Sequence, residues 1–417
     1  MEVPPIVVRL LGAHSLPPIH PSYPKSTRRD VYVTAELRGT LEGVLATARW
    51  PIRSDPNEPR WNSCRSFTTP QPPSGEGSLM LRLRFYDEFG RNDVQCLGTA
   101  EVPVTELDAT LMRVNINLGF REDEGCAYCE LRREDSTAAR GRKVMYIVRH
   151  GESVWNRAQT DQIRVRHNVE HPLNAGGRAQ AESLRAMLRE PGDAASDMLA
   201  AEEVWCSPLT RGVVTALIGL EPFLLPAGAP SPVVDSARHG SRPKTVVLNP
   251  NLCRSGRARG DKLVSRAHTE LLKLLTDDVN GAAALCTVPL ETKDVQNTWW
   301  LGSHTCNEAR HIDERIDELL HQLCHAPAQS LIAVGHSSCF FRMMCLHLNR
   351  DASRGGLHDA TGAALTYEDL TSRKLANLGV AKVTLDFDVW PEAQSIVGVQ
   401  LLFGTQLESE PAKVYMG

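Results

Sequence analysis

Two hydrophobic patterns divide this 417-residue chain. In its first 130 or so residues, short apolar runs at 7–11, 31–37, 79–86 and 97–102 are separated by turns rich in Pro, Gly, Asn and Asp. Short strands at this spacing are typical of an antiparallel all-β sandwich. The first part of the chain is therefore predicted to be a separate β-sandwich domain.

Further along, apolar runs with the character of buried strands alternate with helical patterns. Strands are predicted at the starts of 144–155, 204–216 and 331–342, with helices after residues 149 and 211 and over 340–348. Two more strands are predicted at 375–387 and 395–403. This alternation favours a three-layer α/β domain with a mostly parallel sheet.

The change of pattern gives a domain organisation. We expect a sandwich over 1–131, a polar linker over 132–143, an α/β domain over 144–405 and a tail over 406–417. A chain of this length usually contains two or three domains.

Composition limits the classes of function. The chain is 42% hydrophobic and 23% charged with a net charge of −4, which gives no support for nucleic-acid binding. Its 11 cysteines are scattered, the start resembles no secretory leader, and no apolar run approaches the roughly 18 residues of a membrane span. We expect reduced thiols and a cytoplasmic protein, with peripheral membrane association as an open alternative.

The most informative segment is 144–155, which reads V-M-Y-I-V-R-H-G-E-S-V-W. A buried strand ends there in Arg149 and His150, and Gly151 allows the backbone to turn sharply. Ligand sites of open α/β sheets lie at the C-terminal ends of strands. A guanidinium group can hold two phosphate oxygens and an imidazole can attack phosphorus, so this pair predicts phosphate chemistry.

Three further segments complete a pattern. They read H-P-L-N-A-G-G-R-A-Q at 171–180, V-W-C-S-P-L-T-R at 204–211 and L-I-A-V-G-H at 331–336. In this order, and with R-H-G-E-S-x-W-N before them, they resemble the histidine phosphatase superfamily, the phosphoglycerate mutase-like proteins. The resemblance covers about residues 142–405.

This resemblance implies phosphoryl transfer through a phosphohistidine on His150. Arg149, Arg211 and His336 would clamp the phosphate, and Asn156 would donate to it from the side. The resemblance implies no metal or other cofactor. The implied substrate is a phosphorylated small molecule or a phosphoprotein.

One element of the family pattern is missing. The family usually has a glutamate that protonates the leaving oxygen, and Arg254 stands at the equivalent position here. Asp261 nearby is one candidate substitute, and Arg254 becomes a candidate substrate-binding residue. The resemblance as a whole makes a phosphomonoesterase the leading prediction. A phosphoglycerate-type mutase and a phospholigand-binding scaffold with weak turnover stay open as alternatives.

The first domain resembles a C2 domain in an ordered series of segments, among them V-R-L-L-G-A-H-S-L-P at 8–17, N-E-P-R-W-N at 57–62 and F-Y-D at 85–87. Calcium needs six to eight oxygen ligands. Only Asp30, Asp87 and Asp93 match the acids of the family, and Phe89 occupies another expected acidic position. We therefore expect a calcium-independent module that binds an anionic membrane surface or a protein partner.

Overall fold

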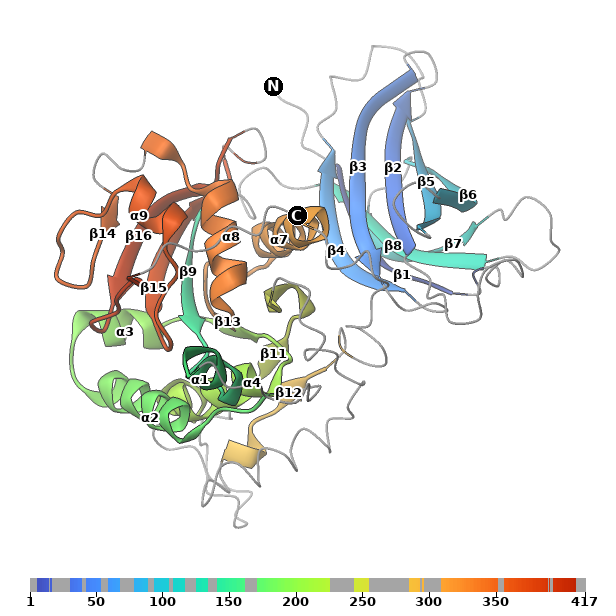
Figure 1. Cartoon of the computed structure of the whole chain (residues 1–417). Helices are drawn as coiled ribbons and strands as arrows, with labels where there is room; N and C mark the ends of the chain where they lie inside the picture. Colours follow the sequence, from blue (N-terminus) through green and yellow to red (C-terminus); the bar gives the residue numbers. More distant parts are fainter. Residues whose placement is uncertain are drawn as a thin grey trace, which may run out of the picture. The chain divides into compact units, whose positions relative to one another are not determined.

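A computed structural model shows how the chain folds (Figure 1). The described residues are 6–14, 16, 31–39, 43–53, 59–67, 79–88, 94–104, 108–116, 125–133, 141–161, 171–225, 244–254, 285–292, 295, 309–351, 356–388, 390 and 393–409. They belong to two compact units. The first comprises Met1–Arg140 and Asn297–Pro327, and the second comprises Gly141–Gln296 and Ala328–Gly417.

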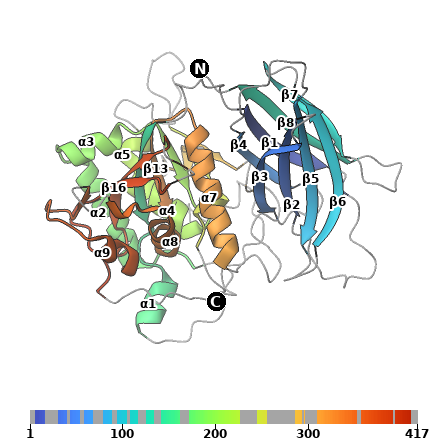
Figure 2. The ribbon, with the colours of Figure 1, turned by 90° about the horizontal axis from the view of Figure 1, so that it is seen from above.

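The first unit contains two four-stranded antiparallel sheets, which confirms the predicted sandwich (Figure 2). One sheet has the order β4-β1-β8-β7 and the other has the order β3-β2-β5-β6. Their strands are β1 (Ile6–His14), β2 (Val31–Gly39), β3 (Gly43–Arg53), β4 (Arg60–Phe67), β5 (Leu79–Glu88), β6 (Val94–Pro103), β7 (Asp108–Ile116) and β8 (Gly125–Arg133).

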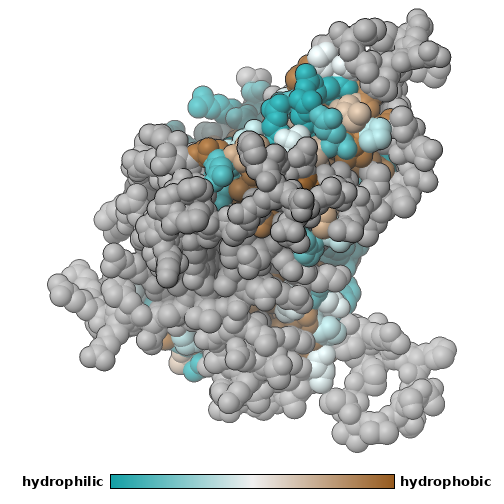
Figure 3. Space-filling view, turned by 90° about the vertical axis from the view of Figure 1, so that its right-hand side faces the viewer, coloured by the Kyte–Doolittle hydropathy of each residue, from teal (hydrophilic) through white to brown (hydrophobic). Residues whose placement is uncertain are grey.

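Strand alternation builds the core of the sandwich. Along β2 and β5, every second side chain is buried, because successive side chains of a strand point to opposite faces of the sheet. Trp61 and Phe85 meet edge to face inside this core, with ring centroids 6.4 Å apart. Outward positions carry ion pairs such as Arg84–Glu36, and hydrophilic side chains gather on the upper part of the face seen in Figure 3.

The helix α7 (Ala309–His325) groups with the sandwich through contacts with β3 and β4 (Figures 1 and 2). The sequence pattern assigns this segment to the second domain, since it lies between two of the phosphatase-like motifs. Arg65 of β4 and Glu318 of α7 form an ion pair, and their side chains are 6% and 0% exposed. Removing either partner would leave the other charge buried and unpaired, which is costly. The pair therefore favours this placement of α7 on β4.

The second unit is built on a mixed eight-stranded sheet of order β12-β11-β10-β13-β9-β15-β16-β14. All neighbours from β12 to β9 are parallel, and β15 is antiparallel to both β9 and β16. The strands are β9 (Arg142–Arg149), β10 (Glu203–Cys206), β11 (Val246–Leu248), β12 (Leu290–Glu291), β13 (Ser330–Gly335), β14 (Leu357–His358), β15 (Val380–Asp386) and β16 (Ile396–Leu402).

Helices accompany this sheet. They are α1 (Val154–Thr160), α2 (Ala175–Arg189), α3 (Asp193–Leu199), α4 (Thr210–Gly219), α5 (Glu221–Leu224), α8 (Ser337–His347) and α9 (Tyr367–Ser372), with short 3-10 turns η1 (Pro250–Leu252) and η3 (Leu285–Thr287). The strands predicted at the starts of 144–155, 204–216 and 331–342 are confirmed, and so is the helix over 340–348.

One predicted strand is shorter than its hydrophobic pattern suggests. The strand expected over 375–387 begins only at Val380, because Leu378 has a positive φ of 57° and turns the backbone out of the extended conformation. Residues 375–379 instead form a loop, and the amide of Leu378 donates to the carbonyl oxygen of His150 at 3.3 Å. This loop therefore lies directly beside the end of β9.

Candidate active site

Three parallel strands end together at one edge of the sheet. β9 delivers Arg149 and is followed by His150, its neighbour β13 is followed by His336, and β10 is followed by Ser207. The C-terminal ends of parallel strands meet at the same edge, where open α/β sheets bind ligands. The sheet topology thus brings together residues that are far apart in the sequence.

The two imidazole rings face each other. The ring centroids of His150 and His336 are 4.8 Å apart with an interplanar angle of 61°, and both residues are buried. The Nδ1 atom of His150 lies 2.6 Å from the carbonyl oxygen of Gly151, which can only accept a hydrogen bond. Nδ1 of the neutral ring therefore carries the proton, and Nε2 is left with its lone pair.

His336 has the opposite tautomer. Its Nδ1 lies 3.5 Å from a guanidinium nitrogen of Arg211, and a guanidinium group can only donate. The Nε2 of His336 therefore carries the proton and donates to the hydroxyl of Ser207 at 2.9 Å. The two rings thus present a free lone pair at His150 and an acceptor that is already occupied at His336.

Burial and positive charge keep both imidazoles neutral. Burial lowers the pKa of His150 well below its ordinary value of 6.5, and Arg211 and Arg149 lower it further. For His336 burial is again the largest cause of the lowered pKa, followed by Arg211, His150 and Arg254. A neutral histidine is the form that can act as a nucleophile.

Thr215 connects the two halves of the site. Its hydroxyl donates to the carbonyl oxygen of Arg211 at 2.7 Å and accepts from the amide of Gly151 at 3.0 Å. Arg211 lies in the first turn of α4 and is 3% exposed. The turn after His150 and the helix that carries Arg211 are therefore held to each other by one side chain.

Arg149 has an acidic partner that no motif marks. One of its guanidinium nitrogens donates to the carbonyl oxygen of Leu375 and to the carboxylate of Glu408. Burial lowers the pKa of Arg149, and Glu408 acts in the opposite direction. Glu408 falls in the segment that the sequence pattern assigns to a tail, yet here it is ion-paired with a predicted phosphate-binding residue.

Of the remaining predicted substrate-binding residues, Arg254 acts electrostatically on both histidines, and Asn156 lies in α1, which begins shortly after His150. The guanidinium carbon of Arg254 lies 5.9 Å from the ring centroid of Trp155, and Arg254 also lowers the pKa of Lys374, for which burial is the largest cause. The Oδ1 atom of Asn156 accepts from the amide of Ser153 at 3.1 Å and from its hydroxyl at 2.6 Å. These bonds fix the side-chain amide of Asn156 at the start of α1.

The turn after His150 packs so closely against the start of α2 that neither Gly151 nor Gly177 leaves room for a Cβ atom. A Cβ atom on Gly177 would lie 2.0 Å from the carbonyl oxygen of Glu152, and one on Gly151 would lie 2.5 Å from the carbonyl oxygen of Gly177. The carboxylate of Glu152 accepts from the side chain of Asn174 at 2.8 Å, so it serves this packing.

Of the three candidate calcium ligands, only Asp87 lies among the described residues. Asp30 and Asp93 lie outside the described residues, whereas Asp87 lies near the end of β5 and is fully buried. In the described part of the chain, no cluster of three or more His, Cys, Asp or Glu residues is arranged to hold a metal ion. The expectation of a calcium-independent domain stays a prediction.

Comparison with known families agrees with both domains. Residues 145–227 match the histidine phosphatase superfamily (branch 1), and residues 5–116 match the C2 domain. The chain therefore carries a C2 domain followed by a histidine phosphatase superfamily domain, in the predicted order. The match to the histidine phosphatase superfamily supports a phosphatase-like or mutase-like function. It includes Arg149, His150 and Arg211 and ends before His336.

Similarity to solved structures is distant. A C2 domain of plant Extended Synaptotagmin 1 is 15% identical with a TM-score of 0.27, and the match covers 33% of this chain and 99% of that one. Human GIVD cytosolic phospholipase A2 is 17% identical with a TM-score of 0.24, and the match covers 34% of this chain but only 20% of the phospholipase. None of the curated proteins compared with the chain matches it significantly. Among the described helices, none is long and apolar enough to span a membrane.

The tight turn gives a matched pair of substitutions. Gly177→Ala places a methyl group against the backbone of Glu152, so we expect a loss of about 1–3 kcal/mol in the free energy of unfolding. Gly176→Ala meets only the ends of the Glu152 and Asn174 side chains, the nearer at 3.1 Å, and should change this free energy by less than about 0.5 kcal/mol. Urea unfolding of both variants checks this expectation, and equal losses would contradict it.

The neutral imidazoles predict a pH dependence of stability. Because the pKa values of His150 and His336 are lowered on folding, the unfolded chain binds more protons than the folded chain below about pH 6.5. Stability should therefore fall as the pH decreases from 6.5, by about 1 kcal/mol per pH unit for each of these histidines. Urea unfolding at pH 7.5 and 5.5 should show a smaller decrease for His336→Gln than for the unchanged protein. An equal decrease would show that His336 is not buried in its neutral form.

Proposed function

We propose that this protein is a phosphomonoesterase that works through a phosphohistidine on His150. The proposal rests chiefly on one observation, the 2.6 Å contact between Nδ1 of His150 and the carbonyl oxygen of Gly151. Because a carbonyl oxygen only accepts, this contact assigns the proton to Nδ1 and leaves Nε2 as a nucleophile. A three-layer α/β domain of the histidine phosphatase type accommodates this arrangement.

Each buried cation has a role in the proposed reaction. Nε2 of His150 attacks phosphorus in line, the phosphorus–nitrogen bond forms, and the bond to the leaving oxygen breaks. Arg149 and Arg211 bind the phosphoryl oxygens, whose negative charge needs positioned donors, and His336 joins them by taking a proton on Nδ1 when the anion binds. A water molecule then attacks phosphorus, and breakage of the phosphorus–nitrogen bond releases inorganic phosphate and restores His150.

A second function is favoured by one feature. Arg254 replaces the acidic residue that the family places near the leaving oxygen, and a missing proton donor costs about 10²–10⁴ in rate. A phospholigand-binding protein with weak turnover would keep the clamp and lose this donor. No comparable feature of the described residues favours a mutase.

The test separates these two functions. With p-nitrophenyl phosphate, whose leaving group needs little protonation, we expect turnover that is abolished by His150→Ala and reduced about 10²–10³-fold by Arg211→Ala. Acid quenching should be avoided, and mass spectrometry under basic conditions should find a phosphoryl group on His150. The control is His358→Ala, which alters a histidine of β14 outside the site. Phosphate binding without any turnover would establish the binding function instead.

We further propose that the C2 domain places the protein peripherally on an anionic membrane surface from the cytoplasm. The domain match supports this proposal, together with the basic residues Lys25, Arg28 and Arg29, which lie outside the described residues. Each basic residue near a charged surface contributes about 1 kcal/mol.

Sedimentation with vesicles tests the membrane proposal. The full chain should bind vesicles that contain phosphatidylserine to the same extent in calcium and in EGTA, because the acidic set is incomplete. The triple variant Lys25→Ala, Arg28→Ala and Arg29→Ala should bind roughly 100-fold more weakly. Binding that requires calcium would overturn the calcium-independent interpretation, and no binding to any vesicle would favour a protein partner.

A further inference from the structure

The carboxylate on Arg149 belongs to a segment that is fixed in place. The amide of Glu408 donates to the carbonyl oxygen of Lys374 at 2.7 Å, and the amide of Ala376 donates to that of Gln406 at 2.9 Å. Between these bonds, Leu375 and Leu407 pair in an antiparallel bridge. Glu408 is therefore held by its backbone at one end of a short β-bridge.

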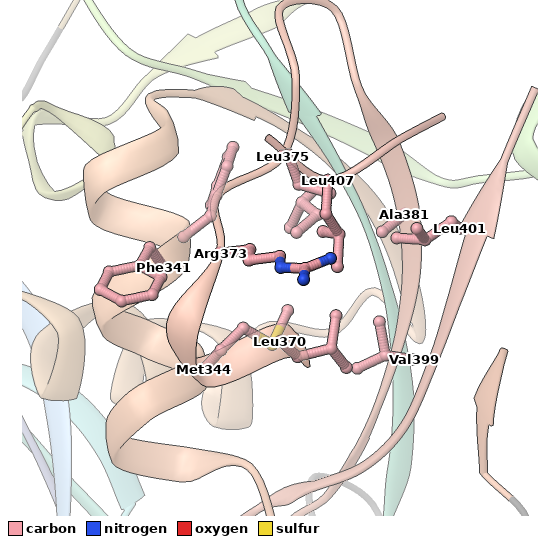
Figure 4. A pocket seen from close by; sticks show the side chains of 11 residues that line it. Phe341, Met344, Leu370, Arg373, Leu375, Ala381, Val399, Leu401 and Leu407 are labelled. Atoms are coloured by element: carbon pink, nitrogen blue, oxygen red, sulfur yellow. The ribbon is translucent and has the colours of Figure 1, made fainter. Parts of the chain in front are cut away.

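An apolar pocket anchors this bridge. Leu375 and Leu407 line it together with Met344 of α8, Leu370 of α9 and Val399 of β16, and they lie close together in Figure 4. Removal of Leu407 from this pocket would expose apolar surface, which opposes movement of the segment. The backbone of Glu408 thus cannot move away from the site without breaking both the bridge and the apolar contact.

The position of Glu408 combines contact with the clamp and access to water. The Arg149 side chain is 7% exposed, whereas that of Glu408 is 39% exposed. A phosphate ester bound to Arg149 would bring its negative charge next to this carboxylate. A carboxyl group in contact with solvent can exchange protons with it, so Glu408 is placed to pass a proton to an ester bound at Arg149.

The reaction needs such a proton. An alkoxide is a poor leaving group, and general acids that protonate it accelerate phosphoryl transfer by about 10²–10⁴. Glu152 is bound to Asn174, Arg254 cannot donate a proton at neutral pH, and Asp261 lies outside the described residues. Among the described carboxylates, Glu408 is the one whose contact with Arg149 is established.

We propose that Glu408 is the proton donor to the leaving oxygen, an inference that rests on the phosphohistidine mechanism proposed above. On binding, the phosphate replaces the Glu408 carboxylate as the partner of Arg149, and the carboxylate accepts a proton from solvent. As Nε2 of His150 bonds to phosphorus, the bond to the ester oxygen breaks and that oxygen receives the proton of Glu408. The carboxylate then accepts a proton from the attacking water, so Glu408 is protonated again when inorganic phosphate forms.

The leaving group provides the test. Glu408→Gln keeps the size of the side chain and removes its proton, so kcat/KM for an alkyl ester, glycerol 2-phosphate, should fall about 10²–10⁴-fold. For p-nitrophenyl phosphate the decrease should be less than about 10-fold, since nitrophenolate leaves without protonation. Glu408→Asp keeps the acid and should lie between the two. Glu182→Gln, which alters an exposed residue of α2, is the control and should change neither substrate.

Each other outcome overturns the proposal in a recognisable way. Equal decreases on both esters would mean that Glu408 only positions Arg149. Faster turnover of both esters, with tighter binding of inorganic phosphate, would mean that the carboxylate merely competes with substrate. If the unchanged protein hydrolyses neither ester, the phosphohistidine function itself fails. If it hydrolyses both and Glu408→Gln keeps their ratio, only the role of Glu408 is wrong.

Discussion

Burial of positive charge at the end of one sheet is the constraint on which the second unit depends. Arg149 and Arg211 are 5% and 3% exposed, and both lie beside buried imidazoles. A buried charge is costly unless it is paired or hydrogen-bonded. The chain reduces this cost in two ways: it keeps both imidazoles neutral, and it supplies Glu408 to Arg149. The positive charge that remains at the site favours the binding of an anion.

Hydrogen bonds and close packing restrain the backbone around the site. The amide of Gly151 is bonded to Thr215, the carbonyl oxygen of Gly151 accepts from His150, and Gly177 leaves no space for a side chain. Together these contacts hold the imidazole in one position. In the proposed phosphoryl transfer, positioning would supply much of the rate, so a rigid turn would serve the reaction.

Much of this arrangement follows from local sequence patterns. The alternation of apolar residues predicts the sandwich, and a strand followed by Arg-His-Gly predicts where the proposed nucleophile lies. The pattern does not reveal Glu408, because Glu408 reaches Arg149 through a pairing of Leu407 with Leu375 that joins two segments of ordinary composition. For the same reason, α7 is not predicted to pack on β3 and β4: its amphipathic pattern indicates a buried face but not what covers that face.

The two histidines show why residue identity alone does not assign roles in such a site. The rings have the same chemistry and nearly the same burial, but a carbonyl oxygen faces Nδ1 of His150 and a guanidinium group faces Nδ1 of His336. A phosphate dianion would reverse the local field and favour a cationic imidazole. His336 can respond, because a proton on its Nδ1 would replace a weak 3.5 Å contact with a bond to the anion. His150 cannot respond without losing the lone pair on Nε2, and formation of the phosphorus–nitrogen bond uses that same lone pair. In the proposed mechanism, the group that faces Nδ1 of each ring, the Gly151 carbonyl for His150 and Arg211 of α4 for His336, therefore decides which histidine attacks and which one binds.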